Sequence, residues 1–280
     1  MHNQNNGGYA TGYNVALRQI QADYYILLNS DIEVTANWIK PIIEFMDSDS
    51  VIGACQPKIR SYSEKEKFEY AGASGGFIDK YGYPFCRGRI FQSLEVDKGQ
   101  YNDSTEVFWA TGACMFIRSD VFHELGGFDD DFFAHMEEID LCWRMKSIGK
   151  KVMVCPSSMV YHVGGGTLPV GSARKTYLNF RNNFVLLYKN LPTNMLFSVL
   201  VLRLFLDGMA GIKFLLQGGF SDFLAVIRAH FYFYGNWSHI HKKRKKTIRN
   251  KVSKVYNGNI AIDHYFYKKK NFSDLKKPFS

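Results

Sequence analysis

The chain has 280 residues, of which 46% are hydrophobic and 16% aromatic, a composition that excludes a disordered protein. This length predicts one large domain with an appendage. Residues 1–170 carry 15 Lys/Arg and 22 Asp/Glu, a net charge of −7, whereas residues 171–280 carry 20 and 4, a net charge of +16. This asymmetry predicts two parts with different partners.

The cysteines predict neither a disulfide framework nor a zinc site. They are odd in number and contain no C-x-x-C pair, a pattern typical of free thiols in a reducing compartment. The positions are Cys55, Cys86, Cys114, Cys142 and Cys155. The polar N-terminal residues contain no apolar stretch, so no signal peptide is predicted.

The first elements place an aspartate beyond a buried strand. Residues 6–14 are predicted to be a loop whose glycines let the backbone approach a ligand, and residues 15–22 a short helix. Residues 24–28 form an apolar strand that ends in Asn29-Ser30-Asp31. Ligands of open α/β sheets bind beyond the carboxyl ends of strands, which makes Asp31 a candidate ligand, although it could simply cap the next element.

The middle of the chain alternates helices and strands. Residues 37–46 predict an amphipathic helix capped by Asn37, and residues 51–56 a second strand. We expect irregular hairpins over residues 60–105, where glycines are frequent. Residues 107–117 predict a strand that carries Trp109, Thr111 and Gly112, and residues 119–125 a short helix.

Residues 129–144 concentrate six carboxylates that precede or open a helix. At helical spacing Glu138 shares a face with Leu141, Cys142 and Met145, whereas Glu137, Asp140 and Arg144 lie on another arc. A first-turn glutamate that binds backbone N–H groups would explain the position of Glu138. The alternative explanation is that Glu138 is a general base at the edge of a cleft, because burial tunes the pKa of a carboxyl group.

A histidine follows the last predicted strands. Residues 151–155 predict a strand stopped by Pro156, and residues 159–162 are extended. His162 precedes Gly164-Gly165-Gly166-Thr167. A lone histidine after a strand is commonly structural, but this one, in a chain with a strand-end aspartate, is a candidate metal ligand.

Together these segments resemble the inverting glycosyltransferases of family 2, and the rhamnosyltransferase-like members most closely. The resemblance covers roughly residues 3–190, and its strength lies in the order of the motifs. Residues 6–14 resemble N-x-G-F-A-x-G-x-N, residues 27–31 the L-L-N-P-D form of D-x-D, and residues 111–115 a G-A segment. Residues 137–144 resemble E-D-x-D-L-C-W-R, and residues 161–167 the H-x-x-G-x-T ending.

The resemblance implies an α/β fold of the GT-A type, a Rossmann-like mixed sheet at residues 1–175, followed by a helical extension at 176–280. It implies transfer of a sugar from a dTDP- or UDP-sugar to a saccharide or lipid-linked saccharide acceptor in cell-surface polysaccharide synthesis. A divalent cation, Mg²⁺ or Mn²⁺, would hold the diphosphate through Asp31 and His162. A catalytically inactive saccharide- or nucleotide-binding relative acting as an assembly subunit is the alternative.

The same resemblance assigns further residues. Gly8, Gly12, Asn14 and Asn29 would line the nucleotide side. Trp109, Thr111 and Gly112 would line the sugar and acceptor side. Glu138 would be the base, because the buried-face geometry and the motif select the same residue, while Glu137 and Asp140 stay open as alternatives.

The chain departs from the family pattern in three ways. Asn29 replaces the first Asp of D-x-D, and Glu138 stands where the family usually has Asp. The family also begins with a strand, a helix and a second strand, and nothing before Asn3 supplies these elements. We therefore expect an N-terminally truncated domain, with roughly 70–90 residues missing, about one βαβ unit and a further strand and helix.

The rear of the chain is apolar and basic. Residues 195–217 are strongly apolar, yet Arg203, Asp207 and Lys213 interrupt the run that a spanning helix needs. With the lysine cluster at 242–246, this predicts a peripheral membrane contact at the cytoplasmic, inner face of the plasma membrane. A helical hairpin packed on the domain with a solvated basic tail is the other interpretation. Nucleic-acid binding would explain the lysines but not the apolar helices, so no nucleic-acid partner is predicted.

Overall fold

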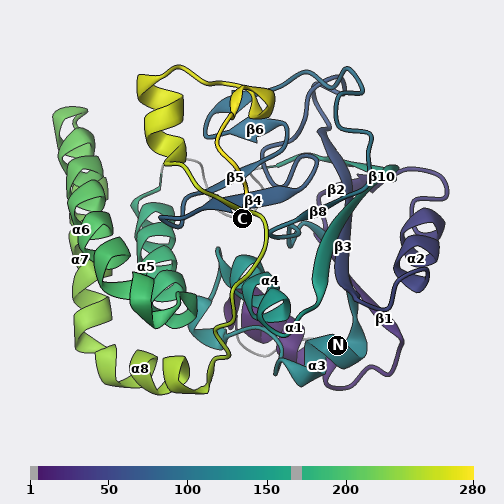
Figure 1. The fold of residues 1–280 in the computed structure, drawn as a ribbon, viewed down its shortest axis with the longest axis horizontal. Coiled ribbons are helices and arrows are strands. Elements are labelled where there is room, and N and C mark those ends of the chain that lie inside the picture. Colours follow the sequence, from purple (N-terminus) through teal and green to yellow (C-terminus); the bar gives the residue numbers. More distant parts are fainter. Residues whose placement is uncertain (1–5, 165–171) are drawn as a thin grey trace.

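The computed structural model describes residues 6–164 and 172–280 and has a mixed sheet at its centre (Figure 1). The sheet order is β1-β9-β3-β10-β2, and β8 also pairs with β10. Its strands are β1 (Tyr24–Leu28), β2 (Ile32–Val34), β3 (Ile52–Ser61), β8 (Thr105–Val107), β9 (Cys114–Arg118) and β10 (Lys151–His162). Because β9 runs antiparallel between β1 and β3, and β3 is parallel to β10, the strands β1, β3 and β10 end at one edge. We call it the carboxyl edge.

Helices cover both faces of this sheet. Along β9, Cys114 and Phe116 pack with α2 (Lys40–Asp47) on one face, while Met115 and Ile117 belong to the larger core on the other. This alternation is the two-residue period of a strand. The larger core is built with α1 (Gly8–Leu17), α3 (Ser119–Glu124) and α4 (Glu137–Ser147). The mixed α/β fold expected from the sequence is confirmed.

A second, smaller sheet occupies the region predicted to be irregular. Its order is β11-β4-β5-β6-β7, and its strands are β4 (Gly76–Asp79), β5 (Pro84–Cys86), β6 (Arg89–Ile90), β7 (Ser93–Leu94) and β11 (Val255–Tyr256). The fully buried Tyr256 brings the C-terminal part of the chain onto this sheet, where it packs against Phe85 and Phe279.

Four helices form a layer beside the sheets: α5 (Ala173–Asn190), α6 (Thr193–Leu216), α7 (Phe220–Gly235) and α8 (Trp237–Lys246). In Figure 1, α5 lies against the sheets, α6 and α7 form the outermost pair, and α8 crosses one end. Short turns complete the structure, 3₁₀ at Asp130–Phe132 and Phe272–Asp274 and π at Ile262–Phe266. The segment after residue 175 is therefore not helical throughout, because β11 joins the second sheet. The division of the chain at residue 175 stays a prediction.

Several element predictions were wrong in their bounds. Residues 8–17 form α1 rather than a loop, because burial of Ala10 and Leu17 outweighs the roughly 1 kcal/mol that a helical glycine costs. Helix α2 begins at Lys40, after a left-handed Asn37 (φ 58) that does not cap it. The strand predicted over 107–117 is reduced to β9. Strand β10 continues past Pro156, because the register shifts between Cys155 and Met159 and removes the proline from the ladder.

Candidate active site

Asp31 and His162 meet at the carboxyl edge. Asp31 follows the end of β1, and His162 is the last residue of β10. The backbone N–H of Val163 donates to the Asp31 carbonyl at 3.0 Å, and His162 Nε2 lies 3.2 Å from Asp31 Oδ1. Two residues that are 131 positions apart are thus joined by strand pairing.

Glu69 contacts the other side of the same imidazole. Its Oε2 lies 3.2 Å from His162 Nδ1, and both side chains are almost fully buried. Burial lowers the pKa of His162, but the hydrogen bonds and charges of Glu69 and Asp31 outweigh it, so the pKa is raised. Sequence reasoning missed Glu69, because nothing near it in the chain signals this contact.

The Asp31–His162 pair fits two ligands of one cation. No group of three or more His, Cys, Asp or Glu side chains able to hold a metal occurs in the described residues. However, two donor atoms bound to one octahedral ion at about 2.1 Å lie about 3 Å apart. The separation of 3.2 Å between Nε2 and Oδ1 is close to that value. A cation would replace the hydrogen bond that now joins them.

Glu137 and Glu138 open α4 after a left-handed Met136 (φ 73). Glu137 is 5% exposed, whereas Glu138 is partly exposed. Each has a buried Oε2 atom without a hydrogen-bond partner among the described residues. A buried carboxyl oxygen without a partner is costly to desolvate. The two glutamates therefore retain hydrogen-bonding capacity that the described residues do not use.

The surroundings of the two carboxyl groups raise the pKa of each. Burial raises the pKa of Glu138 to about 7, an effect that backbone N–H groups of the first turn oppose in part. Burial and the charge of Glu138 raise the pKa of Glu137 well above its usual range. Burial thus brings the pKa of Glu138 close to neutral pH and raises that of Glu137 as well.

Tyr9 connects the glutamates to the carboxyl edge. Its hydroxyl donates to the Gly112 carbonyl at 2.7 Å, just before β9. The Tyr9 pKa is raised well above its usual range, chiefly by burial and further by the charges of Tyr13, Glu137 and Glu138. Tyr9 was not singled out from the sequence, although its position inside the glycine motif was a signal.

Asp140 has a structural environment. It is fully buried, Arg144 Nε donates to it at 2.8 Å, and Lys189 Nζ lies 2.7 Å from its Oδ1. Asn190 donates to the same carboxylate at 2.8 Å. These partners satisfy the charge, and they keep the pKa of Asp140 low in spite of burial. The predicted arcs of this helix do not separate buried from exposed residues, because Glu137 and Asp140 are buried as well.

The predicted nucleotide-side residues of α1 contact protein. Gly8 packs so closely on Phe133 that an added Cβ would lie 2.3 Å from the Phe133 carbonyl oxygen. Asn14 is 4% exposed, and its amide exchanges hydrogen bonds of 2.8 and 2.9 Å with the Phe128 backbone. Gly12 is half-buried within α1. The structure therefore gives Gly8 and Asn14 packing roles.

The remaining predicted residues lie around the start of β9. Trp109 is 4% exposed and donates from Nε1 to the Phe77 carbonyl at 2.9 Å. Thr111 is buried, and its backbone N–H donates to Gln56 at 3.0 Å. Asn29 is half-buried and is held to Ala113 by a backbone hydrogen bond of 3.0 Å. Gly165, Gly166 and Thr167 lie outside the described residues.

The turn before α4 has a strained backbone braced by α5. Phe133 (φ 61), His135 (φ 70) and Met136 (φ 73) all have left-handed conformations, which are costly for residues with a side chain. The Asn182 amide donates to the Phe132, Ala134 and His135 carbonyls at 2.7–2.9 Å. The turn that presents Glu137 and Glu138 is thus held by a helix almost 50 residues later in the chain.

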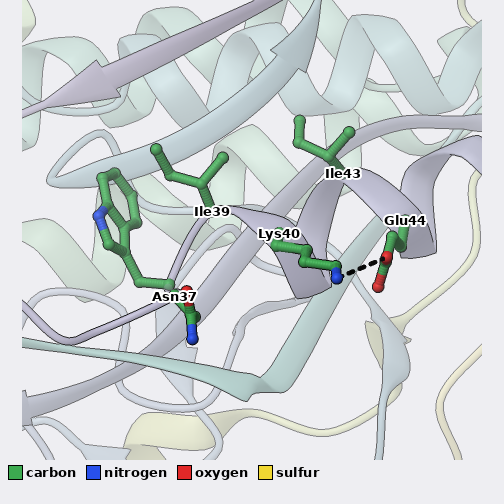
Figure 2. A pocket seen from close by; sticks show the side chains of 6 residues that line it. Asn37, Ile39, Lys40, Ile43 and Glu44 are labelled. Carbon is green, nitrogen blue, oxygen red and sulfur yellow. Dashed lines mark ion pairs between the residues drawn. The ribbon is translucent and has the colours of Figure 1, made fainter.

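None of the predicted site residues lines either of two surface depressions. One, of about 490 Å³, lies at the start of α2 (Figure 2). It is lined by Asn37, Trp38, Ile39, Lys40, Ile43 and Glu44. A second, of about 170 Å³, lies between α5 and α7, with Arg174, Tyr177 and Arg228 in its wall.

Comparisons with known proteins agree with this fold. Residues 1–126 match the family model described as glycosyl transferase family 2. The match ends before α4, so it does not bear on Glu137 or Glu138. In structure, the chain is similar to GalNAc-T7, crystallised with UDP, GalNAc and Mn²⁺, with a TM-score of 0.50 and 15% identity. That similarity covers 69% of this chain and 36% of the other.

Two curated relatives illustrate the sequence similarity. A low-salt glycan biosynthesis hexosyltransferase of Haloferax volcanii is 25% identical over 69% of this chain and 59% of its own length. An N-acetylglucosaminyl-diphospho-decaprenol L-rhamnosyltransferase of Mycobacterium tuberculosis is 25% identical over 56% of each. The chain thus spans little more than half the length of these relatives. Its residues 1–126 match the model of glycosyl transferase family 2, its fold is of the GT-A type, and its sequence is similar to those of rhamnosyl- and hexosyltransferases.

Proposed function

We propose that this protein is an inverting glycosyltransferase in which Glu138 is the general base. One observation carries the assignment. A carboxyl oxygen of Glu138 is buried without a partner, on a side chain that is still partly exposed. Its pKa of about 7 is suited to accepting a proton at neutral pH. Glu137 is more deeply buried, and Asp140 is already paired with Lys189 and Arg144.

In the proposed step Glu138 accepts the proton of an acceptor hydroxyl as that oxygen attacks the anomeric carbon. The new bond forms on the face opposite the leaving group, while the bond from the anomeric carbon to the diphosphate oxygen breaks. The electron pair of that bond leaves with the nucleoside diphosphate, and the configuration at the carbon is inverted. Glu138 is left protonated and later returns its proton to solvent.

The diphosphate needs positive charge as it departs. Asp31 and His162 are the residues that would hold a divalent cation, Mg²⁺ or Mn²⁺, which supplies charge neutralisation when bound. Glu69 would orient His162 from the other side, as carboxylates do for histidine ligands. The donor set of one carboxylate and one imidazole favours Mn²⁺.

We further propose a dTDP- or UDP-sugar donor and a saccharide or lipid-linked saccharide acceptor in cell-surface polysaccharide synthesis. Support comes from the Mycobacterium relative, whose name specifies a sugar on a decaprenyl diphosphate, and from the UDP in the GalNAc-T7 structure. Such an acceptor is available at the cytoplasmic side of the plasma membrane, which is where we propose that the protein acts.

A donor screen tests the proposal. The chain is incubated with dTDP- and UDP-sugars, Mn²⁺ and lipid-diphosphate saccharides, and nucleoside diphosphate release is measured. NMR then gives the anomeric configuration of the product. We expect transfer with inversion that is lost in Glu138→Gln and kept in Glu124→Gln, a control that removes an exposed carboxylate of α3.

Two outcomes would contradict the proposal. A product with retained configuration would exclude a single displacement with a carboxylate base. Donor binding by calorimetry without turnover, with every acceptor, would instead favour a catalytically inactive binding or assembly subunit.

A further inference from the structure

Helix α6 turns its apolar residues toward solvent. Phe205 is 64% and Leu216 82% exposed, and their neighbours on the same stripe are exposed too. The stripe covers roughly a third to a half of the helix circumference. It consists of Phe197, Val201, Phe205, Met209, Ile212 and Leu216.

The polar residues of the same helix point inward. Arg203 and Asp207 are almost fully buried and pair at 2.9 Å, and His230 of α7 lies 3.2 Å from Asp207. The Arg203 guanidinium stacks over the Tyr83 ring at 4.0 Å. The amphipathic pattern is therefore inverted relative to a helix that packs on a core and faces water.

Exposed aromatic residues also occur on neighbouring elements. Phe231 on α7 is 70% exposed, and Phe266 on the π turn is 80% exposed. Lys213 of α6 lies 4.9 Å from the Tyr265 ring centre, which places this turn beside the end of α6. The two elements are also close in Figure 1. We call the α6 stripe and the turn at 265–267 the apolar face.

We propose that the apolar face docks on an anionic lipid bilayer and holds α6 flat in its interface. Charge selects this occupant, because Lys268 and Lys270 directly follow the exposed aromatic residues of the turn. Residues 171–280 carry 20 Lys/Arg against 4 Asp/Glu. Exposed tyrosines and lysines beside an apolar stripe are typical of the headgroup region. The inference does not depend on glycosyl transfer.

The packing of α6 favours a flat position over a span. The helix has 24 residues and a mean hydropathy of 1.9, so by length and composition it could cross a membrane. Its inner side, however, packs through Arg203 against Tyr83 in the turn between β4 and β5, and Val199 and Gly211 are buried on the same side. Only one face is free, which is the geometry of an interfacial helix.

Two basic residues of the α8 cluster contact the rest of the protein, whereas Lys242, Lys245 and Lys246 are exposed. Lys243 pairs with Asp129 and Asp131, and Arg244 is buried and donates to the Leu191 carbonyl at 2.8 Å. These residues join α8 to the domain. The lysines that face the bilayer in this proposal are those of the tail at 268–270.

A site-specific label tests which surface meets lipid. All five cysteines are buried, so an added surface cysteine can be labelled selectively with an environment-sensitive fluorophore. Phe205→Cys places the label on the apolar face, and Ile20→Cys places it on an exposed apolar position after α1. With vesicles containing 30% phosphatidylglycerol, we expect a blue shift and intensity gain at position 205 but not at position 20.

Vesicle flotation with unlabelled variants tests how much the apolar side chains and the lysine charges contribute to membrane binding. Phe205→Ser/Leu216→Ser should lower binding to anionic vesicles at least tenfold, while Ile20→Ser leaves it unchanged. Lys268→Gln/Lys270→Gln should lower it several-fold and weaken its salt dependence, because exposed charges are screened by salt. Lys98→Gln/Lys245→Gln removes the same charge elsewhere and should change binding less.

Three results would overturn the proposal. One is the absence of vesicle binding by the wild-type chain, and another is an equal spectral change at positions 20 and 205. The third is a dimer, measured by light scattering, that Phe205→Ser/Leu216→Ser dissociates without affecting vesicle binding. That result would assign the apolar face to a second copy of the chain.

Discussion

Glu137 and Glu138 are adjacent in sequence but differ in exposure and charge. Glu138 keeps a path to solvent and has a pKa of about 7, whereas the pKa of Glu137 is raised further by burial and by its neighbour. Under the proposed function Glu138→Gln keeps the shape and removes the base. Turnover should fall by about 10²–10⁴, with donor binding retained. Steady-state kinetics and calorimetry measure both, and a severe loss in Glu137→Gln with a mild one in Glu138→Gln would reverse the assignment.

The same carboxyl group should lower stability at alkaline pH. Its folded pKa of about 7 exceeds the ordinary 4.5, so between these values the folded state binds more protons than the unfolded state. The free energy of unfolding therefore falls as pH rises from about 4.5 to about 7 and stays lower above it.

Replacing Glu138 by Gln should remove this dependence. Relative to wild type, we expect Glu138→Gln to gain on the order of 1–3 kcal/mol between pH 4 and pH 8. Urea unfolding at the two pH values measures the difference. A difference between variant and wild type that is the same at pH 4 and pH 8 would show that the carboxyl group is not destabilised by burial.

At the scale of elements, the closest approach of α1 to the turn before α4 is at Gly8. Gly8 has φ +79, and an added Cβ would lie 2.3 Å from the Phe133 carbonyl. Gly149 has φ +85 with nothing within 4 Å, so it isolates the conformational cost, about 1–2 kcal/mol. Gly8→Ala should cost clearly more than Gly149→Ala in urea unfolding. Equal losses of unfolding free energy in the two variants would mean that the turn shifts to accommodate the added methyl group without further cost.

The brace from α5 to the same turn should act on catalysis as well as stability. Asn182→Ala removes hydrogen bonds to three carbonyls of residues 132–135 and should cost about 1–3 kcal/mol. Because the turn positions Glu138, turnover should fall while the KM for donor changes little. Asn236→Ala, which loses one bond to the Tyr232 carbonyl, is the control. Unchanged turnover in Asn182→Ala would make the brace purely structural.

At the scale of the whole molecule, a buried ion pair within α6 contacts His230 of α7 and Tyr83 in the turn between β4 and β5. Asp207→Ala would leave Arg203 buried without its partner, which typically costs about 3–5 kcal/mol. Arg203→Met/Asp207→Leu removes both charges and should be closer to wild type in urea unfolding. A double variant as unstable as Asp207→Ala would indicate that Arg203 contributes mainly through its contact with Tyr83.

The sequence alone determined the fold class, the family and most helices of the rear segment. These depend on local signals: apolar periodicity, strand-end polar residues and the order of short motifs, all visible within about 15 residues. The meeting of Asp31 and His162 was also predictable, because both follow strands whose carboxyl ends share an edge.

Only the tertiary structure decided what each side chain contacts. Glu69 contacts His162, although the two residues are far apart in the chain. Asn14 and Trp109 donate hydrogen bonds to backbone carbonyls of the protein itself. The polar side of α6 faces inward. Helical periodicity defines which residues share an arc but not which arc is buried. That choice depends on the surfaces that distant segments present, here Tyr83 in the turn between β4 and β5 and His230 of α7.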